Sequence, residues 1–459
     1  MADSKPVLII GAGISGLACG WFLRKLGVPF LVVEQSARPG GLIRSVQQDG
    51  YLLEQGPQSF LLTPLLLEII RELGLESSLL RADPRAARYV VLTGKLVPVP
   101  LSPPGLFAGS LLGARTKWSF LHDAFGRSQP PAEDESIAAF VRRKFTAELL
   151  DRLVGPFVSG IYAGDPERLS LRGAFPVIHE LEFKYGSVIR GAIKSRGENG
   201  SSRLGSCSFA GGNEALLSAL AQALGPGLRR NTSVDHITRE ETPRGVEYAA
   251  TLSSGGAQET LRASVLILAT PAQTSATLLR TLSPLLSELL ASVESAPVAL
   301  LHTGYPRARV GASLSGFGFL VPRSENRSLL GTVWNSSLFP GRAPEGHVLF
   351  TSFAGGTFNP ALASASPEEI RDMLLPELQP LLSLQGNPSF WSVQRYARAI
   401  PQYNLGHAAR VETLRSLSAR EPGLFLAGNF LDGPAVGACA DVARRVAGQA
   451  GDFFRSRPA

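Results

Sequence analysis

The 459-residue sequence predicts an α/β protein built on a discontinuous Rossmann-like domain, with an α+β domain and a mostly helical insertion beside it. Three observations predict this arrangement. A strand, a glycine turn and a helix follow one another over residues 6–26, and a second series of the same kind lies at residues 423–454. Between them, helix signals dominate residues 80–195 and short strands dominate residues 295–395.

A glycine turn follows the first apolar stretch of the chain. Residues 6–10 have the pattern of a fully buried strand, and they lead through this turn into an amphipathic helix over residues 17–26. In such a motif Gly11 permits the tight turn, Gly13 lets the backbone approach a pyrophosphate, and Gly16 allows close contact between helix and strand. The motif therefore predicts a dinucleotide site at the helix N-terminus, where backbone N–H groups attract phosphate.

An acidic residue follows this turn at the expected distance. The next predicted strand, residues 28–33, ends in Glu34, about twenty residues after the glycines, where a carboxylate would bind ribose hydroxyls. Arg38, Gly40 and Gly41 then supply a second small-residue turn and a cation where a diphosphate would lie. This extension resembles the flavoprotein amine-oxidase superfamily rather than NAD dehydrogenases, and the resemblance implies FAD as cofactor.

A second half-site is predicted near the other end of the chain. A strand over residues 423–427 leads into Gly428 and Asn429, and a helix follows from about residue 438 to residue 454. Similar C-terminal segments in the superfamily close over the ribityl chain and the flavin pyrimidine edge, so the Rossmann-like domain must be discontinuous. Because the GxGxxG pattern between a strand and a helix occurs only once in the sequence, with no second one for a nicotinamide, an oxidase that uses oxygen is favoured over an NADPH-dependent enzyme.

Segments from the middle of the chain complete the predicted cofactor site. Strands are expected over residues 229–237, 246–252 and 265–268, with Val234 as a backbone contact to adenine, and the glycines at 211–212 begin a helix close to the cofactor. No metal site is expected. The predicted FAD-binding residues are Gly11, Gly13, Ile14, Ser15, Gly16, Glu34, Gln35, Arg38, Gly40, Gly41, Leu42, Gly56, Pro57, Gln58, Val234, Ala269, Tyr396, Gly428, Asn429, Val436 and Gly437.

Helix caps and short strands divide the remaining residues. Thr63 and Ser136 are predicted to cap helices, and Ser366 begins a capping box. Short strands are expected over residues 298–303, 317–321, 329–334 and 348–353. We expect an FAD-binding domain from residues 1–60, 200–290 and 396–459, a substrate-binding domain from residues 61–80 and 291–395, and a mostly helical domain from residues 81–199.

Residues 95–112 are apolar and proline-rich, but too interrupted to cross a bilayer. Basic residues and a tryptophan, Lys95, Arg115, Lys117 and Trp118, flank this stretch as interfacial residues do. The stretch either enters one leaflet of a membrane or covers its own core, and the sequence leaves both alternatives open.

Composition limits the partners of the protein. The formal charge of +7 favours an acidic partner, such as anionic lipid or a polycarboxylate substrate. Nucleic acid is not expected, because lysines and arginines form no basic block and no zinc-finger or RNA-recognition motif occurs. The three cysteines are widely spaced and the first strand begins within a few residues of Met1, so we expect a reducing, cytoplasmic compartment, with peripheral binding to the inner face of the cell membrane as an option.

Several motifs in the middle of the chain are more specific. They are Arg88-Tyr89, GPFVSGIYAGDP at residues 155–166, LSL at 169–171, FKYGSV at 183–188, GFGFLVP at 316–322 and FAGG at 353–356. In their order and spacing the chain resembles the protoporphyrinogen/coproporphyrinogen oxidase family of oxygen-dependent flavoenzymes. The resemblance runs from the first predicted strand to the last predicted helix.

The resemblance implies a reaction and a set of substrate contacts. A porphyrinogen would lose six electrons in three rounds of hydride transfer to the flavin, which oxygen would reoxidise with release of peroxide. Gly160 is placed at the catalytic position, where it and Ala163 bring bare backbone against the meso-carbon side of the tetrapyrrole. Arg88 would bind a substrate propionate, while the hydrophobic residues that sandwich the rings would be Leu320, Val333 and Phe353.

Alternative functions remain open from the sequence. Protoporphyrinogen IX is the expected substrate, and coproporphyrinogen III is the alternative. The additional propionates of coproporphyrinogen III would require additional cations in the pocket. A flavin amine oxidase and a non-catalytic protein like the GDP-dissociation inhibitors are further alternatives. Some family members have a tryptophan where this chain has Tyr396. Porphyrinogen and oxygen are the expected small-molecule partners, and a homodimer and a contact with ferrochelatase are further expectations.

Overall fold

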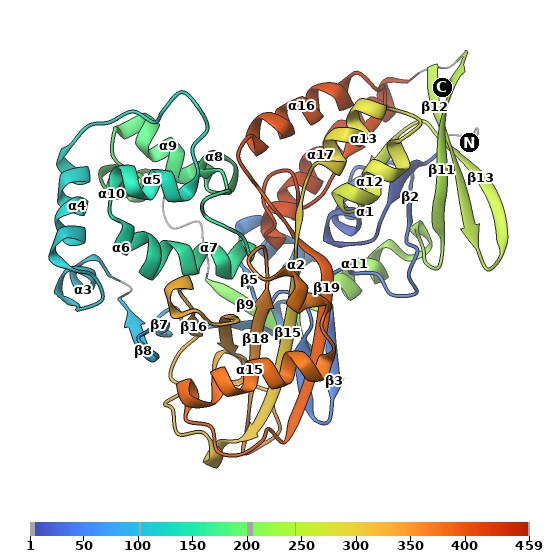
Figure 1. Cartoon of the computed structure of the whole chain (residues 1–459). Coiled ribbons are helices and arrows are strands. Elements are labelled where there is room, and N and C mark those ends of the chain that lie inside the picture. Colours follow the sequence, from blue (N-terminus) through green and yellow to red (C-terminus); the bar gives the residue numbers. More distant parts are fainter. Residues whose placement is uncertain (1–4, 101, 200–204, 244, 458–459) are drawn as a thin grey trace.

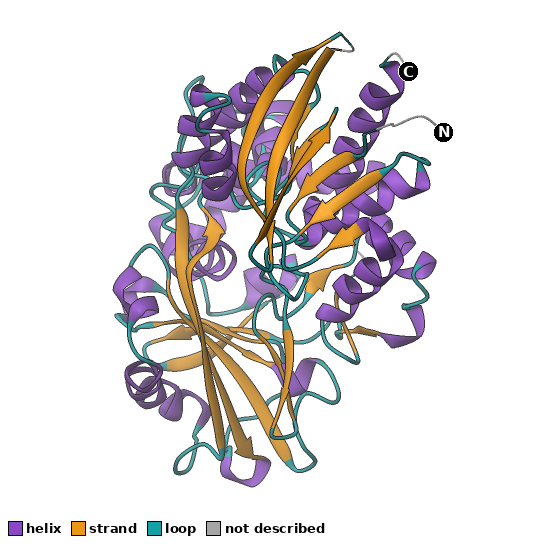
Figure 2. Cartoon of the chain, turned by 90° about the vertical axis from the view of Figure 1, so that its right-hand side faces the viewer, coloured by secondary structure: helices purple, strands orange, loops and turns teal. Residues whose placement is uncertain are grey.

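The computed structural model describes residues 5–100, 102–199, 205–243 and 245–457. Figure 1 shows three parts: a parallel sheet with its helices on the right, a large and mostly antiparallel sheet below, and a helical part on the left. Figure 2 shows the strands of the two large sheets one above the other. The α/β fold class is confirmed. The three-domain division stays a prediction, and its boundary at residue 200 lies outside the described residues.

The first sheet is parallel and its strands come from distant parts of the sequence. Its order is β10-β2-β1-β14-β20. The strands are β1 (Val7–Ile10), β2 (Phe30–Val33), β10 (Leu228–Arg229), β14 (Leu266–Leu268) and β20 (Leu424–Leu426). Side chains of β1, β14 and most of β2 are buried on both faces, which explains the unbroken apolar runs in their sequence.

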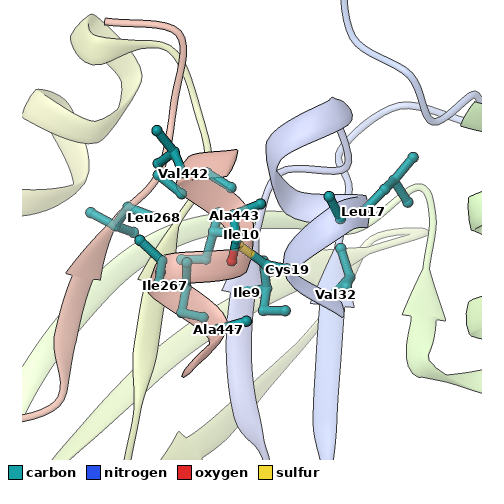
Figure 3. Packing of buried hydrophobic residues seen from close by; sticks show 14 of the residues in the cluster. Ile9, Ile10, Leu17, Cys19, Val32, Ile267, Leu268, Val442, Ala443 and Ala447 are labelled. Atoms are coloured by element: carbon teal, nitrogen blue, oxygen red, sulfur yellow. The ribbon is translucent and has the colours of Figure 1, made fainter. Parts of the chain in front are cut away.

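Helices from both ends of the chain cover this sheet. Helix α1 (Ile14–Lys25) packs along α17 (Val436–Ser456), and the thiol of Cys19 lies 3.7 Å from the carbonyl oxygen of Ala443. Figure 3 shows Cys19 between Ala443, Ala447 and the strand residues Ile9 and Ile10. The prediction that the two ends of the sequence build one sheet is therefore confirmed.

Two parts of the FAD-binding region differ from the prediction. The expected strand over residues 229–237 is divided, because β10 joins the parallel sheet whereas β11 (Ser233–Thr242) begins a separate three-stranded sheet with β12 (Gly245–Ser254) and β13 (Ala257–Ala263). Helix α2 (Pro64–Glu72) was assigned to the substrate domain, but its buried leucines and isoleucines pack in the core of the parallel sheet. This packing favours the FAD-binding region for α2, while the domain assignment of residues 61–80 stays a prediction.

Other elements complete this region. The short strands are β3 (Ser45–Gln48), β4 (Tyr51–Glu54), β5 (Phe60–Leu61), β6 (Leu79–Arg81) and β9 (Ser206–Phe209). The helices are α11 (Glu214–Leu224), α12 (Ala272–Leu279), α13 (Pro284–Ala291) and α16 (His407–Ala419).

The second large sheet has seven strands in the order β19-β15-β18-β17-β16-β7-β8. They are β7 (Arg88–Leu92), β8 (Lys95–Val99), β15 (Ser295–Pro306), β16 (Gly318–Leu320), β17 (Leu329–Trp334), β18 (His347–Gly355) and β19 (Phe390–Pro401). The four short strands predicted between residues 298 and 353 are confirmed. Helix α15 (Pro367–Leu382) covers one face, and it begins with the predicted capping box at Ser366.

The helical part contains α3 (Pro103–Ala108), α4 (Ala114–Phe125), α5 (Ile137–Lys144), α6 (Ala147–Leu149), α7 (Gly155–Tyr162), α8 (Leu171–Ala174), α9 (Pro176–Tyr185) and α10 (Val188–Asn199). The prediction of helix over residues 81–199 is wrong at its start, since residues 88–99 form the β7–β8 hairpin of the second sheet. The parallel pairing of β7 with β16, more than 200 residues away, stabilises this hairpin and could not be read from the local sequence.

Candidate active site

The glycine turn between β1 and α1 has the geometry that the sequence predicts. A Cβ atom on Gly16 would lie 1.8 Å from the carbonyl oxygen of Gly11, so only glycine fits there. A Cβ atom on Gly13 would have no atom within 4 Å. Gly16 thus brings the helix against the turn, while Gly13 leaves the space in front of the turn open for a ligand.

The N-terminus of α1 can bind an anion. Its N-cap is Gly13, which offers no side-chain acceptor, and no acidic residue occurs in its first turn. The first-turn N–H groups, including those of Ile14 and Ser15, therefore remain for an external acceptor such as a phosphate. Among the described residues no group of His, Cys, Asp and Glu side chains could hold a metal ion.

Glu34 lies beside this turn, directly after β2. Its carboxylate accepts hydrogen bonds from the backbone N–H of Ala12 at 2.8 Å and of Ser36 at 2.9 Å. These bonds fix the carboxylate at the edge of the glycine turn and leave lone pairs on both oxygens for further donors. Gln35 is exposed next to it.

Arg38 is held in place by its own loop and by Glu214. Its guanidinium donates to the carbonyl oxygens of Gly41 at 2.7 Å and Ile43 at 3.0 Å, and it pairs with Glu214 at 3.2 Å. The side chain therefore holds the loop that contains Gly40 and Gly41 in shape, rather than standing as a free cation. Its predicted contact with the cofactor stays a prediction, as do those of Gly40, Gly41 and the exposed Leu42.

The loop at Gly56, Pro57 and Gln58 is clamped from two sides. A Cβ atom on Gly56 would lie 2.1 Å from the carbonyl oxygen of Leu42, so the loop touches the Arg38 loop directly. The carbonyl oxygen of Pro57 accepts a hydrogen bond from the side-chain amide of Asn213 at 2.6 Å. The loop is thus held against two other segments that are predicted to contact the cofactor.

A buried ion pair that the sequence analysis did not predict supports these segments. Glu54 and Arg342 are each 1 % exposed, and their charged groups lie 3.4 Å apart. Glu54 also accepts from the hydroxyl of Ser45 at 2.7 Å and the N–H of Asn213 at 2.9 Å. Burial raises the pKa of the Glu54 carboxyl, and the charge of Arg342 and the hydrogen bonds oppose this effect. Nothing in the sequence marks these two residues among the other charged residues of the chain.

The C-terminal half-site follows β20. The carbonyl oxygen of Asn429 accepts a hydrogen bond from the hydroxyl of Tyr403 at 2.6 Å, which fixes the backbone after Gly428. Helix α17 begins at Val436, and a Cβ atom on Gly437 would lie 2.8 Å from a methyl group of Thr63. Its N-terminus has no side-chain cap. A second uncapped helix N-terminus is thus available for a polar ligand.

The remaining predicted cofactor residues lie in three places. Val234 packs at the edge of the first core, and the side chain of Ala269 lies against the glycine turn. Tyr396 packs in a small apolar cluster with Ala163 and Phe353, two of the predicted substrate residues. Burial raises the pKa of the Tyr396 phenol, with opposing effects from the charges of Arg38 and Arg44. The structure therefore brings predicted cofactor and substrate residues together at Tyr396.

One face of the seven-stranded sheet carries the other predicted substrate residues. Across the strands Arg88 is paired with Gly318, which is paired with Val333, and Leu320 is paired with Gly331, which is paired with Phe353. Because paired residues point to the same side of a sheet, Arg88, Leu320, Val333 and Phe353 share one face. The opposite face carries the core under α15.

Helix α7 crosses this face. A Cβ atom on Gly160 would lie 2.7 Å from a methyl group of Leu320, which is too short for a carbon–carbon contact. The helix can therefore lie this close to Leu320 only because residue 160 has no side chain. Ala163 ends the helix in a left-handed conformation, with φ of 47°, and its carbonyl oxygen accepts from the N–H of Thr357 at 2.8 Å. Phe157 and Ile161 are exposed on the same helix.

Arg88 is a free cation at the edge of this face. Its guanidinium lies 5.3 Å from the centre of the Phe317 ring. Within residues 5–100, 102–199, 205–243 and 245–457 it makes no salt bridge, unlike Arg38 and Arg342. An exposed guanidinium without a carboxylate partner can bind an external carboxylate through two hydrogen bonds.

Comparison with known proteins agrees with this geometry. Residues 14–449 match the family of flavin containing amine oxidoreductases. The chain therefore belongs to this family and is an FAD-dependent oxidoreductase. The open glycine turn and the two uncapped helix N-termini fit that cofactor.

Sequence relatives assign the chain to a smaller group within this family. It is 34 % identical to the chloroplastic protoporphyrinogen oxidase of Oryza sativa, over 98 % of this chain and 89 % of the relative. It is 30 % identical to the coproporphyrinogen III oxidase of Bacillus subtilis, over 96 % of this chain and 97 % of the relative. Within the larger family, the chain is thus a member of the protoporphyrinogen/coproporphyrinogen oxidases.

Solved structures support the fold alone. A crystal structure from Exiguobacterium superposes with a TM-score of 0.80 at 24 % identity, covering 98 % of this chain and 99 % of that one. The cyclohexylamine oxidase of Brevibacterium oxydans superposes with a TM-score of 0.70 at 21 % identity, covering 99 % of this chain and 100 % of that one.

Proposed function

We propose that this enzyme oxidises protoporphyrinogen IX to protoporphyrin IX, with oxygen as electron acceptor and hydrogen peroxide as by-product. The single observation that carries this proposal is the contact of Gly160 with Leu320 on a sheet face that also presents Arg88. FAD, held by the glycine turn at residues 11–16 and the C-terminal half-site, would supply the hydride-accepting and oxygen-reducing chemistry. Each of three rounds removes two electrons and two protons from the substrate and reduces one oxygen molecule to peroxide.

The residues of the chain bind and orient the substrate in this reaction. Leu320, Val333 and Phe353 offer an apolar face for the tetrapyrrole, and Arg88 binds a propionate at the edge of that face. Gly160 lets the meso-carbon side of the ring system approach the backbone of α7. Orientation and exclusion of water, rather than a strong acid or base, are what a hydride transfer from carbon requires of the protein.

The basic residues of the helical part favour a substrate with two propionates. Lys184 and Lys194 lie over the ring of Tyr185, at 4.9 and 5.9 Å from its centre. The guanidinium of Arg190 donates to the carbonyl oxygen of Gly126 at 2.5 Å. These cations are engaged within the helical part, so Arg88 is the cation that we assign to a substrate propionate. Coproporphyrinogen III, with four propionates, is the alternative substrate.

A direct assay decides between the two substrates. The purified holoenzyme is mixed under air with protoporphyrinogen IX or coproporphyrinogen III, and porphyrin fluorescence and peroxide are followed together. We expect faster turnover of protoporphyrinogen IX with release of peroxide. Faster turnover of coproporphyrinogen III would reverse the substrate assignment, and no turnover of either would contradict the proposed function.

Exposed apolar side chains on the helical part support peripheral membrane binding. Trp118 and Phe125 of α4 are 69 % and 83 % exposed, and Phe183 and Ile193 of the neighbouring α9 and α10 are similarly exposed. The predicted stretch, residues 95–112, contributes less than expected, because it begins as strand β8 and its Leu111 and Leu112 are buried. No helix among the described residues is long and apolar enough to span a membrane.

We therefore propose α4, α9 and α10 as the membrane-binding surface. Co-sedimentation with anionic liposomes tests it, with Trp118→Ser and Phe125→Ser together as the variant and Leu285→Ser as the control, since Leu285 is 63 % exposed on α13. The double variant should lose binding and the control should retain it. Equal binding by both would contradict this surface. The cytoplasmic location, the homodimer and the ferrochelatase contact stay predictions.

A further inference from the structure

Four buried side chains form a continuous hydrogen-bonded chain between the two large parts of the molecule. The amide nitrogen of Asn335 lies 2.6 Å from the amide oxygen of Gln58. The hydroxyl of Thr351 lies 2.8 Å from the amide oxygen of Asn335, and Nδ1 of His302 lies 3.0 Å from the same hydroxyl. None of the four residues is more than 7 % exposed.

The hydrogen-bond partners give this chain a single direction. Both N–H groups of the Gln58 amide are used, because they donate to the carbonyl oxygens of Glu54 at 2.8 Å and Gly56 at 2.9 Å. Its oxygen must therefore accept from Asn335, whose own oxygen accepts the hydroxyl proton of Thr351.

His302 is the end of the chain. Since the one proton of the Thr351 hydroxyl is used, that oxygen accepts from the Nδ1–H of His302, which fixes the tautomer of the ring. Full burial lowers the pKa of His302 to about 4, so the imidazole is neutral at neutral pH. No member of the chain can rotate without breaking a buried hydrogen bond.

The middle of the chain lies beside predicted substrate residues, and one end lies at a predicted cofactor residue. Thr351 is two residues before Phe353 on β18, and Asn335 is two residues after Val333. Thr351 is also paired with Val333 across the strands, so its side chain points to the substrate face. At the other end, Gln58 belongs to the loop that is predicted to contact FAD.

We propose that Asn335 and Thr351 are positioning residues that fix the amide of Gln58 and so couple the substrate face of the sheet to the flavin-binding loop. This inference rests on the proposed function, because the loop matters for catalysis only if it contacts the flavin. A substrate in contact with Phe353 and Val333 would lie close to Thr351 and Asn335, because each is two residues away along the chain. The hydrogen bonds of Thr351 and Asn335 lead to Gln58 in the flavin-binding loop. The hydrogen bonds of Asn335 and Thr351 join these segments directly, whereas Phe353 and Val333 lie in two different apolar clusters.

Replacement of Thr351 tests the proposal. Thr351→Val keeps the shape of the side chain but removes the donor to Asn335 and the acceptor for His302. Thr332→Val is the matched control, because Thr332 makes a buried hydroxyl contact with Ser352 at 3.0 Å between β17 and β18, next to Thr351 but on the opposite face of the sheet. Thr351→Ser retains the hydroxyl and should restore the function.

Two measurements distinguish a loss of positioning at the flavin from a general loss of folding stability in the variants. The first is the absorption spectrum of the bound flavin without substrate, and the second is the rate of flavin reduction by protoporphyrinogen IX under anaerobic conditions. For Thr351→Val we expect a shifted flavin band and a reduction rate lower by about tenfold to hundredfold, which is the size of effect that small misplacements of reacting groups produce. Thr332→Val and Thr351→Ser should match the wild-type protein in both readouts.

Two results would overturn the proposal. One is a Thr351→Val protein with the same flavin spectrum and reduction rate as Thr332→Val, and the other is an equal loss in Thr351→Ser. If Thr351→Val does not fold, Asn335→Ala removes the donor to Gln58 from the other side and has to change the flavin spectrum. A wild-type protein whose flavin is not reduced by the porphyrinogen would contradict the proposed function instead, because the spectral comparison needs no substrate.

Discussion

Substitution of Gly160 should remove porphyrinogen oxidation and leave the protein folded with FAD bound. In Gly160→Ala the new Cβ atom would lie 2.7 Å from a methyl group of Leu320, whereas carbon atoms in contact ordinarily stay about 3.5–4.0 Å apart. Leu320 therefore has to move by about 1 Å, toward the space that the substrate is proposed to occupy. Gly160→Val adds two further methyl groups at the same place.

The cost in stability should be small. Replacing a helical glycine gains roughly 0.5–1 kcal/mol of helix propensity. Moving Leu320 off its preferred rotamer costs about 0.5–1.5 kcal/mol. Because these contributions nearly cancel, we expect the free energy of unfolding to change by no more than about 1 kcal/mol, and the Tm by less than about 3 °C.

The assay measures turnover and flavin content in the same preparation. Porphyrin fluorescence under air should show kcat/KM lower by at least about tenfold in Gly160→Ala and more in Gly160→Val, while the flavin absorbance per protein is unchanged. Gly448→Val on α17 is the control, because a Cβ atom there would have no atom within 4 Å. Leu320→Ala should restore part of the activity of Gly160→Val. Normal turnover by Gly160→Val with its flavin bound would refute the placement of the substrate on this face.

Three further predictions follow from the packing and charge of the protein. Gly16→Ala should give a colourless protein by absorbance after purification, because its Cβ atom would lie 1.8 Å from the carbonyl oxygen of Gly11; retention of flavin would contradict the role of this turn. Arg342→Met should lower the free energy of urea unfolding by about 3–5 kcal/mol, because it leaves the carboxylate of Glu54 buried without its cation, and a second substitution, Glu54→Gln, should recover part of the loss. Burial acts to raise the pKa of Glu182, but hydrogen bonds from Arg143 and Ser128 and the nearby positive charges outweigh it and lower the pKa to about 2. The stabilisation from Glu182 is therefore complete above its unfolded pKa and is lost as the pH falls toward 2, so the Tm of the wild-type protein should decrease over that range more steeply than that of Glu182→Gln.

The strands, turns and helices on which the predicted cofactor site stands could be predicted from the sequence because their signals are local. The apolar run before Gly11, the position of Glu34 and the glycines after residue 427 depend only on short segments, and each lies in the structure where the sequence places it. The hairpin at residues 88–99 could not be predicted in the same way, because its strands are stabilised by pairing with β16. Its own sequence does not contain that information.

Buried polar residues were missed for a different reason. Glu54, Arg342 and His302 look like ordinary polar residues in the sequence, and only the folded chain shows that they are nearly or fully inaccessible to water. Asn335 and Thr351 are equally inconspicuous. The functional reading of Gly160 came from the resemblance to a family rather than from the residues near it, and the structure adds the neighbour, Leu320, that explains why a glycine is needed.

The parallel sheet has a consequence for the biogenesis of the enzyme. Strand β20 and helix α17 lie against β14 and α1, which the ribosome makes far earlier. During synthesis, the outer edge of β14 and the side of α1 that α17 covers must therefore stay open until more than 420 residues have been made. FAD can meet a complete pocket only after that point. Completion of the predicted cofactor site is thus tied to the synthesis of α17, and a chain that terminates before this helix should have exposed apolar surface, a form that cellular quality control can recognise and degrade.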